Sequence, residues 1–296
     1  MTDLGTAPGI PREEADANDA LEQRATPFTA LYEHWERHQW SALALDLDTD
    51  AASFEALDES ERDGLVWIFA NRFHAEFNVA RLLAPFLLAA PSYEMQLLLA
   101  TQVADEHRHL QTVLRIYEEV FGVRGGLPAV AELANRNLDP VSKTLLYDKL
   151  EEWVLPLNER RDEDTFLQAV IVYHLLGEGV IARTGQNLAA GQYERLRGFP
   201  GLTEGQRLVS RDEARHIGIG VSYLRQRMEV DPGRTRGLID EVVEDAMRVA
   251  GEMLETANAS MGDLVVTGYG VDPAGFYAEV MRLVQLRLRS IGYLDA

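Results

Sequence analysis

Apolar residues recur at intervals of three and four along most of the chain, which is the spacing of one face of an α-helix. Between residues 61 and 90 the repeat runs through Leu65, Ile68, Phe69 and Phe73. The same spacing, ended in several places by glycine or proline, predicts the other helices. The predicted helical ranges are 30–40, 61–90, 93–121, 141–155, 164–190, 203–228, 235–261 and 273–289.

Long helices joined by short turns predict an all-α fold, a ferritin-like four-helix bundle with additional helices. Runs of alternating β-branched residues with hairpin turns do not occur in the sequence, so strands are predicted to be minor or absent. Thr203 is the predicted N-cap of its helix. The composition stays uniform over residues 27–296, which predicts one helical domain there. Residues 1–26 are acidic, contain Pro8 and Pro11, and are predicted to form a flexible arm.

The charge and the cysteine count exclude several classes of function. A formal net charge of −20 repels the phosphate backbone and anionic lipid surfaces, so we expect neither nucleic acid nor a membrane surface as a partner. The chain has no cysteine, which excludes disulfides, thiolate nucleophiles and iron–sulfur clusters. Any metal ion must therefore bind to imidazole and carboxylate groups, which suit iron, manganese and zinc.

The sequence shows no targeting or membrane signal. The most apolar window, residues 82–100, contains Pro85, Pro91 and Glu94, whereas a membrane span needs about 20 apolar residues with few charges. It is predicted to be a pair of buried helices. The N-terminal residues lack the basic start and apolar stretch of a secretory signal. A cytoplasmic location is the expectation.

One five-residue pattern, Asp-Glu-x-Arg-His, occurs twice, 107 residues apart and each time in the middle of a predicted helix. Glutamate and histidine at positions i and i+3 lie on one helix face, so both can reach the same divalent metal ion. Two copies on facing helices predict two half-sites. The copies are Asp105-Glu106-His107-Arg108-His109 and Asp212-Glu213-Ala214-Arg215-His216.

A lone glutamate precedes each copy in apolar sequence, Glu76 by 30 residues and Glu178 by 35, counted to the motif glutamate. An isolated carboxylate buried among such residues is costly, and a metal ion offsets that cost. The order of residues matches the helical di-metal arrangement, in which two helices give one Glu each and two give Glu-x-x-His. The alternative is a structural charge network of the same residues. The predicted ligands are Glu76, Glu106, His109, Glu178, Glu213 and His216.

The aspartates that begin the two motifs are predicted to support the ligands from outside. A metal-bound imidazole usually donates its other N–H to a carboxylate or carbonyl. We expect Asp212 to accept from His109, and Asp105 to accept from His216. Glu178 and Glu213 are expected to swing between bridging and terminal binding as the valence of the metals changes.

These motifs resemble the ferritin-like carboxylate di-metal proteins and, within them, the ribonucleotide reductase small-subunit-like ligand-binding oxidases. The likeness runs from about residue 40 to residue 293. It is carried by Val79 three residues after Glu76, by Tyr173 five residues before Glu178, and by the segment 210–216. Trp40 is similar to a tryptophan position of the family and is interpreted as packing against the bundle.

The resemblance implies a function. It implies a manganese and an iron ion, or two iron ions, with dioxygen as co-substrate. It implies an ether cross-link between Val79 and Tyr173, a long-chain fatty acid or similar apolar ligand in a tunnel beside the metals, and a homodimer. Read without the family, Val79 is a core methyl group and Tyr173 is a buried phenol bonded to a glutamate.

The sequence departs from the family by its extra histidines, His107 and His174. His174 lies four residues before Glu178 on the same face, so it is either a seventh ligand, a residue that supports a ligand from outside, or a histidine bonded to a polar neighbour. An additional histidine ligand also occurs in di-iron arylamine N-oxygenases, on a different helix. That family is an alternative.

Three other di-metal families are alternatives. A ribonucleotide reductase small subunit usually has a tyrosine where this chain has Val113, four residues after His109. Ferritins are shorter bundles with one such site. An acyl-carrier desaturase needs a basic patch for its acidic carrier, and the only candidates are on the last predicted helix: Arg282, Arg287 and Arg289.

Overall fold

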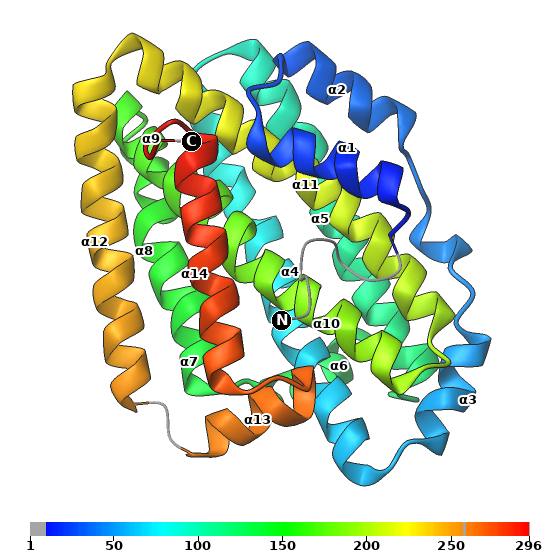
Figure 1. Ribbon diagram of the computed structural model, residues 1–296. Coiled ribbons are helices and arrows are strands. Elements are labelled where there is room, and N and C mark those ends of the chain that lie inside the picture. Colours follow the sequence, from blue (N-terminus) through cyan, green and yellow to red (C-terminus); the bar gives the residue numbers. More distant parts are fainter. Residues whose placement is uncertain (1–9, 257–258, 296) are drawn as a thin grey trace.

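The computed structural model describes residues 10–256 and 259–295, and within them every regular element is a helix. Figure 1 shows long helices lying side by side, with shorter helices across their ends. The all-α prediction is therefore confirmed. In chain order the elements are α1 (Arg12–Gln23), α2 (Phe28–Arg37), η1 (Ala42–Ala44), α3 (Asp48–Ala56), α4 (Glu59–Ala89), α5 (Tyr93–Arg115), η2 (Ile116–Val120), α6 (Gly126–Asn137), α7 (Pro140–Lys143), η3 (Thr144–Lys149), α8 (Leu150–Val154), η4 (Leu155–Asn158), α9 (Glu163–Val170), η5 (Ile171–Ala182), α10 (Arg183–Leu196), α11 (Pro200–Val230), α12 (Pro232–Thr256), α13 (Ala259–Tyr269) and α14 (Pro273–Ser290).

Four long helical runs form the central bundle: α4, α5, the continuous run α9–η5–α10, and α11. α4 packs along α5, and η5 packs along α11. The bundle has two apolar clusters, one built around Phe86 and Leu98 and the other around Phe69 and Val113. Each of the four runs passes from one cluster to the other, so its middle turns lie between two regions of buried apolar side chains.

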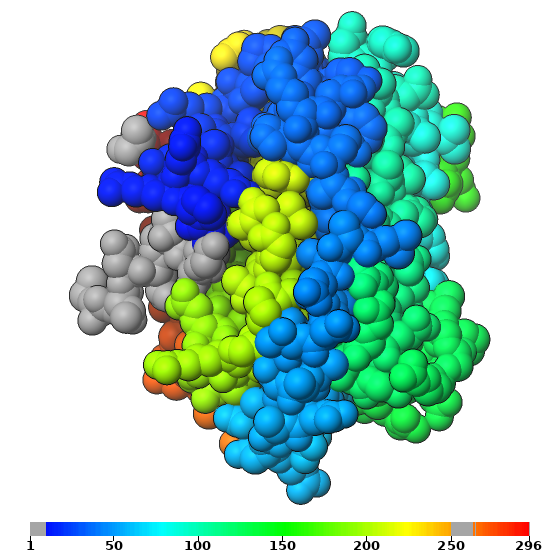
Figure 2. Space-filling view, turned by 90° about the vertical axis from the view of Figure 1, so that its right-hand side faces the viewer, coloured from blue at the N-terminus to red at the C-terminus, as the bar shows by residue number. Residues whose placement is uncertain are grey.

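The predicted flexible arm is wrong for Arg12–Gln23, which form α1. This helix packs on α11, and its Asn18 and Glu22 side chains are buried. Glu22 pairs with Arg183 of α10 and Arg287 of α14. These partners are far away in the sequence, so local composition gave no sign of the docking. Figure 2 shows the blue N-terminal helices lying alongside the yellow-green residues of α11. Residues 1–9 lie outside the described part of the chain.

The predicted N-cap at Thr203 is also wrong, because α11 begins at Pro200. The first N–H groups of α11 are bound by the buried Asp50 of α3, which accepts from Gly201 N at 2.9 Å and from Leu202 N at 2.7 Å. A carboxyl group from a different helix therefore replaces the local cap and lets the helix start three residues earlier.

Several other helices differ from the prediction. α3 and α6 were not predicted, because each is short and buries few side chains. The predicted helix 141–155 is helical but is divided among α7, the π-helical η3 and α8. The predicted helix 235–261 corresponds to α12, and residues 257–258 lie outside the described part.

A π-helical segment, η5, occupies the centre of the run that was predicted as a helix over 164–190. π-helical turns are rare and often lie at functional sites. η5 contains Tyr173, His174 and Glu178. Arg287 of α14 donates its Nε–H to Gly179 O in this segment at 2.9 Å. The segment is therefore held by a partner outside its own helix.

By length and composition alone, the run Glu163–Leu196 could cross a membrane, and 67% of its most apolar window is buried inside the protein. In this fold the run is the inner helix that packs on α11. Its apolar residues face other helices, as expected for the core helix of a bundle.

Candidate metal centre

Six carboxylate and imidazole side chains meet in the middle of the bundle, between its two apolar clusters. α4 contributes one glutamate, η5 contributes another, and α5 and α11 each contribute a Glu-x-x-His pair. All six are between 0 and 5% exposed. They are the six residues that the sequence predicted as ligands: Glu76, Glu106, His109, Glu178, Glu213 and His216.

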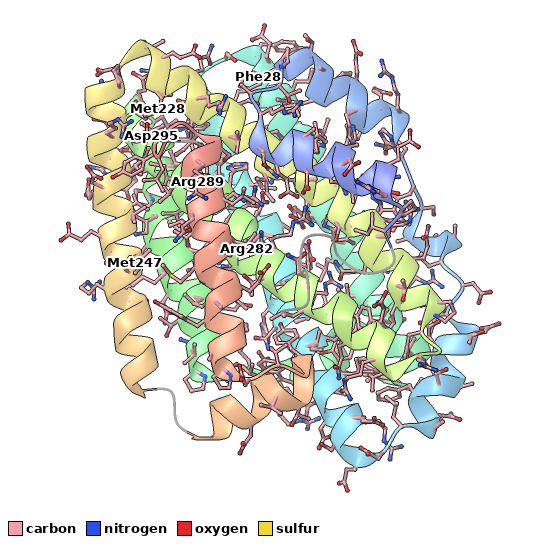
Figure 3. All side chains as sticks on the ribbon, viewed as in Figure 1. Phe28, Met228, Met247, Arg282, Arg289 and Asp295 are labelled. Atoms are coloured by element: carbon pink, nitrogen blue, oxygen red, sulfur yellow. The ribbon has the colours of Figure 1, made fainter. Side chains whose placement is uncertain are left out.

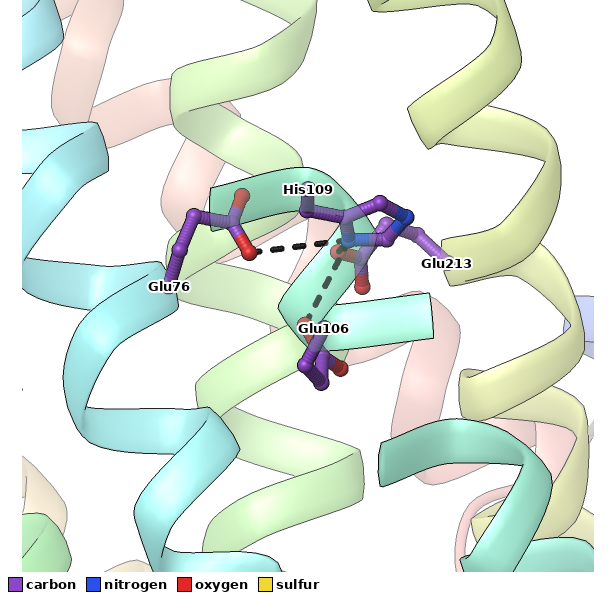
Figure 4. A group of neighbouring side chains, drawn as sticks. All are labelled: Glu76, Glu106, His109 and Glu213. Atoms are coloured by element: carbon purple, nitrogen blue, oxygen red, sulfur yellow. Dashed lines mark ion pairs between the residues drawn. The ribbon is translucent and has the colours of Figure 1, made fainter. Parts of the chain in front are cut away.

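The first group of donor atoms surrounds His109. Its Nδ1 lies 3.5 Å from Glu76 Oε2, 3.4 Å from Glu106 Oε2 and 3.5 Å from Glu213 Oε1. Figure 4 shows these side chains converging from α4, α5 and α11. One atom from each residue lies within 4.8 Å of the others, which is a spacing that can hold a metal ion.

The second group surrounds His216. Its Nδ1 lies 3.1 Å from Glu106 Oε1, 3.8 Å from Glu178 Oε1 and 3.8 Å from Glu213 Oε2. Glu106 and Glu213 each direct one oxygen to each group, so they are placed to bridge two ions. Glu76 and Glu178 belong to one group each, in the place of terminal ligands. This division between bridging and terminal positions was not predicted from the sequence.

The inner atoms of the two groups lack ordinary hydrogen-bond partners. Within the described part of the chain, both oxygens of Glu106, Nδ1 of His109, and Nδ1 of His216 are buried without one. Glu178 and Glu213 each have one such oxygen as well. A buried polar atom without a partner costs about 1–3 kcal/mol. Divalent cations satisfy such atoms together, so the donor set fits two metal ions.

The protonation of the site shows the same need for positive charge. Burial raises the pKa of Glu76 to about 7 and raises the pKa of Glu178 well above its usual value. Burial alone lowers the pKa of His109, but its hydrogen bond with Asp212 and the nearby carboxylates of Glu106 and Glu76 raise that pKa well above the usual value. Two divalent ions would balance four carboxylates with neutral imidazoles, so metal ions compete with protons here.

Each histidine has the outer aspartate that was expected. His109 Nε2 lies 3.2 Å from Asp212 Oδ2, and His216 Nε2 lies 3.2 Å from Asp105 Oδ2. Because a carboxylate only accepts, each imidazole must donate from Nε2. This leaves the Nδ1 lone pair facing the site.

Tryptophan and arginine complete the outer contacts, which sequence reasoning largely missed. Trp40 was expected only to pack, but it donates its indole N–H to Asp212 Oδ2 at 2.7 Å. Trp35 makes the equivalent bond to Asp105 Oδ1 at 2.9 Å. Arg215 pairs with Asp105 at 2.6 Å. The arginine of the repeated pattern was the available signal for this last contact.

Comparison with known proteins connects this geometry to a fold. No family model matches the chain. Three similar solved structures are R2-like ligand-binding oxidases with a reconstituted Mn/Fe cofactor. The first carries a valine-to-alanine change, is 21% identical, covers 90% of this chain and 93% of its own, and has a TM-score of 0.77. The second, a valine-to-isoleucine variant, is 22% identical, covers 90% and 94%, and has a TM-score of 0.77. The third, a glutamate-to-aspartate variant, is 22% identical, covers 90% and 93%, and has a TM-score of 0.76.

This chain has the fold of the R2-like ligand-binding oxidases. The fold places the pair expected from the family resemblance, Val79 and Tyr173, in contact. Tyr173 is buried, and its hydroxyl donates to Val79 O at 3.3 Å. The tyrosine therefore bonds to a backbone carbonyl. The alternative of a phenol bonded to a glutamate is not what the structure shows.

His174 lies outside both groups of possible ligand atoms in the described residues. It is buried, and its Nε2 lies 3.1 Å from Gln102 Oε1. Of the readings left open by the sequence, the structure shows the histidine bonded to a polar neighbour, and it does not place His174 among the possible ligands. Gln102 itself was not singled out by the sequence.

A cavity of about 10 Å³ lies beside Glu76 and His109 and is also lined by Val209. Such a volume is the size of about one water molecule. Ligand pockets for larger molecules usually measure about 300–1,000 Å³. The tunnel expected for a fatty acid is not formed by this cavity.

The three arginines considered as a basic patch on α14 do not form one. Arg287 is fully buried and paired with Glu22, and Arg282 is paired with Glu279 at 2.8 Å. Figure 3 shows Arg282 and Arg289 on different turns of α14. The feature that an acyl-carrier desaturase would require is therefore missing from this helix.

Proposed function

We propose that this protein is a dinuclear metal oxidase that uses dioxygen to remove two electrons from an apolar substrate. The observation that carries the proposal is the pair of buried donor groups, each with one imidazole, that share Glu106 and Glu213. The proposed ligands are the six residues named above. Either manganese with iron or two iron ions suit this donor set, and the R2-like neighbours contain Mn/Fe.

The two metal ions would supply the electrons and the Lewis acidity needed to activate dioxygen. The chain's residues would orient and protect that chemistry. Asp212 and Asp105 hold the imidazoles in one tautomer. The apolar clusters on both sides of the site keep bulk water away from it.

We also propose an ether cross-link between Val79 and Tyr173, in keeping with the family resemblance. A C–O bond would form, and one C–H bond of Val79 and the O–H bond of Tyr173 would break. Two electrons and two protons would pass to dioxygen. The support is the contact between the Tyr173 hydroxyl and the Val79 backbone, which brings the two residues within reach.

The substrate is proposed to be apolar, and a long-chain fatty acid is the candidate from the resemblance. The cavity beside Glu76 is too small for such a molecule, so side chains along the cavity would have to move. Val209, Phe69 and Ile116 line it and could provide an apolar surface after such a movement.

Peptide mass spectrometry tests the proposal. The protein is loaded with manganese and iron, its metal content is measured, and one half is exposed to air while the other stays anaerobic. We expect a joined pair of peptides containing Val79 and Tyr173, lighter by two hydrogens, only after exposure to air. The Tyr173→Phe variant is the control, because it has no hydroxyl to join.

The two readouts separate the parts of the proposal. A sample that binds two metals but forms no joined peptide would leave a di-metal oxygenase without the cross-link, and the N-oxygenase alternative would gain support. A sample that binds no metal would refute the di-metal function itself.

A further inference from the structure

The two halves of the site have the same order of proposed ligands. They differ in the residue that lies one helical turn before each motif glutamate. Glu76, Glu106 and His109 of the first half correspond to Glu178, Glu213 and His216 of the second. Four residues before the motif glutamates, which is one helical turn, the chain has Gln102 on α5 and Val209 on α11. One half of the repeat therefore has a hydrogen-bonding side chain where the other has an apolar one.

Gln102 makes a direct contact with one terminal glutamate. Its Nε2 donates to Glu178 Oε1 at 2.7 Å. Its Oε1 lies 3.1 Å from Nε2 of His174. A metal-binding Glu178 is ionised and only accepts, so the amide NH₂ then faces Glu178 and the amide oxygen faces His174. His174 must then donate from Nε2, so the direction of both hydrogen bonds follows from the chemistry of the groups.

His174 has little freedom to release Gln102. Its ring is packed against the rings of Phe86 and Tyr173, with centroids 5.5 Å and 4.8 Å away. A Cβ atom at Gly220 of α11 would lie 2.4 Å from the Cβ of His174, so only glycine allows this approach of the two helices. Burial lowers the pKa of His174 to about 3, so the ring is neutral and keeps one donor and one acceptor nitrogen.

Among the described residues, no amide takes the equivalent position beside the other terminal glutamate, Glu76. Val209, at the corresponding position, has no hydrogen-bond donor in its side chain. It lines the small cavity together with Glu76 and Arg72. Glu76 therefore lies beside a cavity the size of about one water molecule, whereas Glu178 lies against a fixed amide.

We propose that Gln102, oriented by His174, is a positioning residue that fixes the carboxylate of Glu178 as a terminal ligand of the half-site with His216. This inference rests on the proposed di-metal function. It replaces the expectation that Glu178 swings between binding modes and assigns that freedom to Glu76. The half-site of His216 is then preorganised, and the half-site of His109 is adjustable.

Manganese(II) binding tests the inference without using activity. Free Mn(II) is measured by its EPR signal as metal is titrated into the metal-free protein. Glu76→Ala and Glu178→Ala each remove one terminal ligand and serve as backgrounds. In Glu76→Ala, we expect Gln102→Met to weaken the tighter remaining binding by about 10-fold or more. In Glu178→Ala the same change should have less than about a 2-fold effect, since its target is gone.

Val209→Met is the matched control, because it makes the same new side chain at the corresponding position of the other half. In the Glu76→Ala background it should leave Mn(II) affinity within about 2-fold, if the role belongs to the amide of Gln102. Circular dichroism of the metal-free variants checks folding. If Gln102→Met does not fold, Gln102→Leu replaces it with the same expected result.

The role of His174 is tested by comparing single variants of His174 and Gln102 with the double variant. His174→Phe keeps the ring and removes the donor, and should weaken the same binding step as Gln102→Met. The double variant should be no weaker than Gln102→Met alone, because His174 acts through Gln102. His174→Gln, which offers an N–H of similar reach, should restore part of the affinity.

The outcomes distinguish this inference from the proposed function. Equal effects of Gln102→Met in both backgrounds, no effect in either, or additive effects of the two substitutions would overturn the positioning role while two metals still bind. Wild-type protein that binds no Mn(II) and no iron would overturn the di-metal function and this inference together.

Discussion

At the scale of single residues, the site depends on which nitrogen of each histidine faces the shared donor atoms of Glu106 and Glu213. Asp212 and Asp105 decide this, because each occupies the Nε2–H of one histidine. The same aspartates are held by indole and guanidinium groups, so their own orientation is fixed. The direction of an imidazole is therefore set by residues that do not touch the proposed ions.

Asp212→Ala should weaken Mn(II) binding by about 10-fold or more, because His109 loses the group that fixes its tautomer. The measurement is the same EPR titration of free Mn(II). Asp46→Ala, at an exposed aspartate, is the control. Unchanged affinity in Asp212→Ala would refute the supporting role of this carboxylate.

His34 is predicted to make the metal-free protein less stable in acid. Its Nε2 is buried without a hydrogen-bond partner in the described residues, and burial lowers its pKa to about 4. The unfolded chain takes up a proton near pH 6.5 and the folded chain only near pH 4, so stability falls as the pH drops through this window.

The thermal midpoint of the metal-free protein between pH 8 and pH 4 measures this effect. The thermal midpoint of His34→Phe should fall less than that of wild type between pH 6.5 and pH 4. Above pH 7 the thermal midpoints of the two proteins should change with pH in the same way. His107→Gln, at an exposed histidine, should follow the wild-type profile. A profile of His34→Phe that is parallel to wild type throughout would contradict the prediction.

At the scale of elements, two features of the bundle depend on long-range contacts. α11 begins where Asp50 of α3 binds its first N–H groups. α1 is held by Glu22, which neutralises two buried arginines from α10 and α14. Arg287 also donates to the π-helical segment that contains Glu178. The N-terminal helix is thus connected through one arginine to the run that carries a proposed ligand.

Glu22→Ala should lower the free energy of unfolding by about 3–5 kcal/mol, because it leaves buried guanidinium groups without their carboxylate. Urea denaturation of the metal-free protein gives this value. Glu13→Ala, on an exposed position of the same helix, should stay within about 0.5 kcal/mol of wild type. Equal stability of the two variants would show that α1 is not held by these ion pairs.

At the scale of the whole molecule, four helices bring charged groups together between two apolar clusters. The order of proposed ligands, one Glu followed by a Glu-x-x-His pair, occurs once in each half of the bundle. Two divalent ions would match the charge of the four glutamates at the site, so the metal-free and metal-loaded protein should differ in stability.

The resemblance to the ligand-binding oxidases predicts a homodimer, which can be checked by light scattering. We expect a single species with twice the 33.1 kDa mass of the chain. A much larger cage would instead support iron storage. A monomer would contradict the prediction of assembly and leave the site unaffected, since all six proposed ligands lie in one chain.

The sequence by itself determined the helical class and the six proposed ligands. Both are local or repeated signals: a spacing of three and four residues for the helices, and a glutamate and histidine one turn apart for the site. The two glutamates in apolar sequence, Glu76 and Glu178, were detectable because a charge in such a place needs a partner.

Only the tertiary structure decided which carboxylates both donor groups share, where α11 begins and that α1 joins the bundle. Each depends on groups that are far apart in the sequence: Asp50 with Gly201, and Glu22 with Arg287. The same holds for the chain from His174 through Gln102 to Glu178, whose members lie on two helices. Hydrogen bonds and ion pairs of this kind form only after the helices have packed, so no local pattern encodes them.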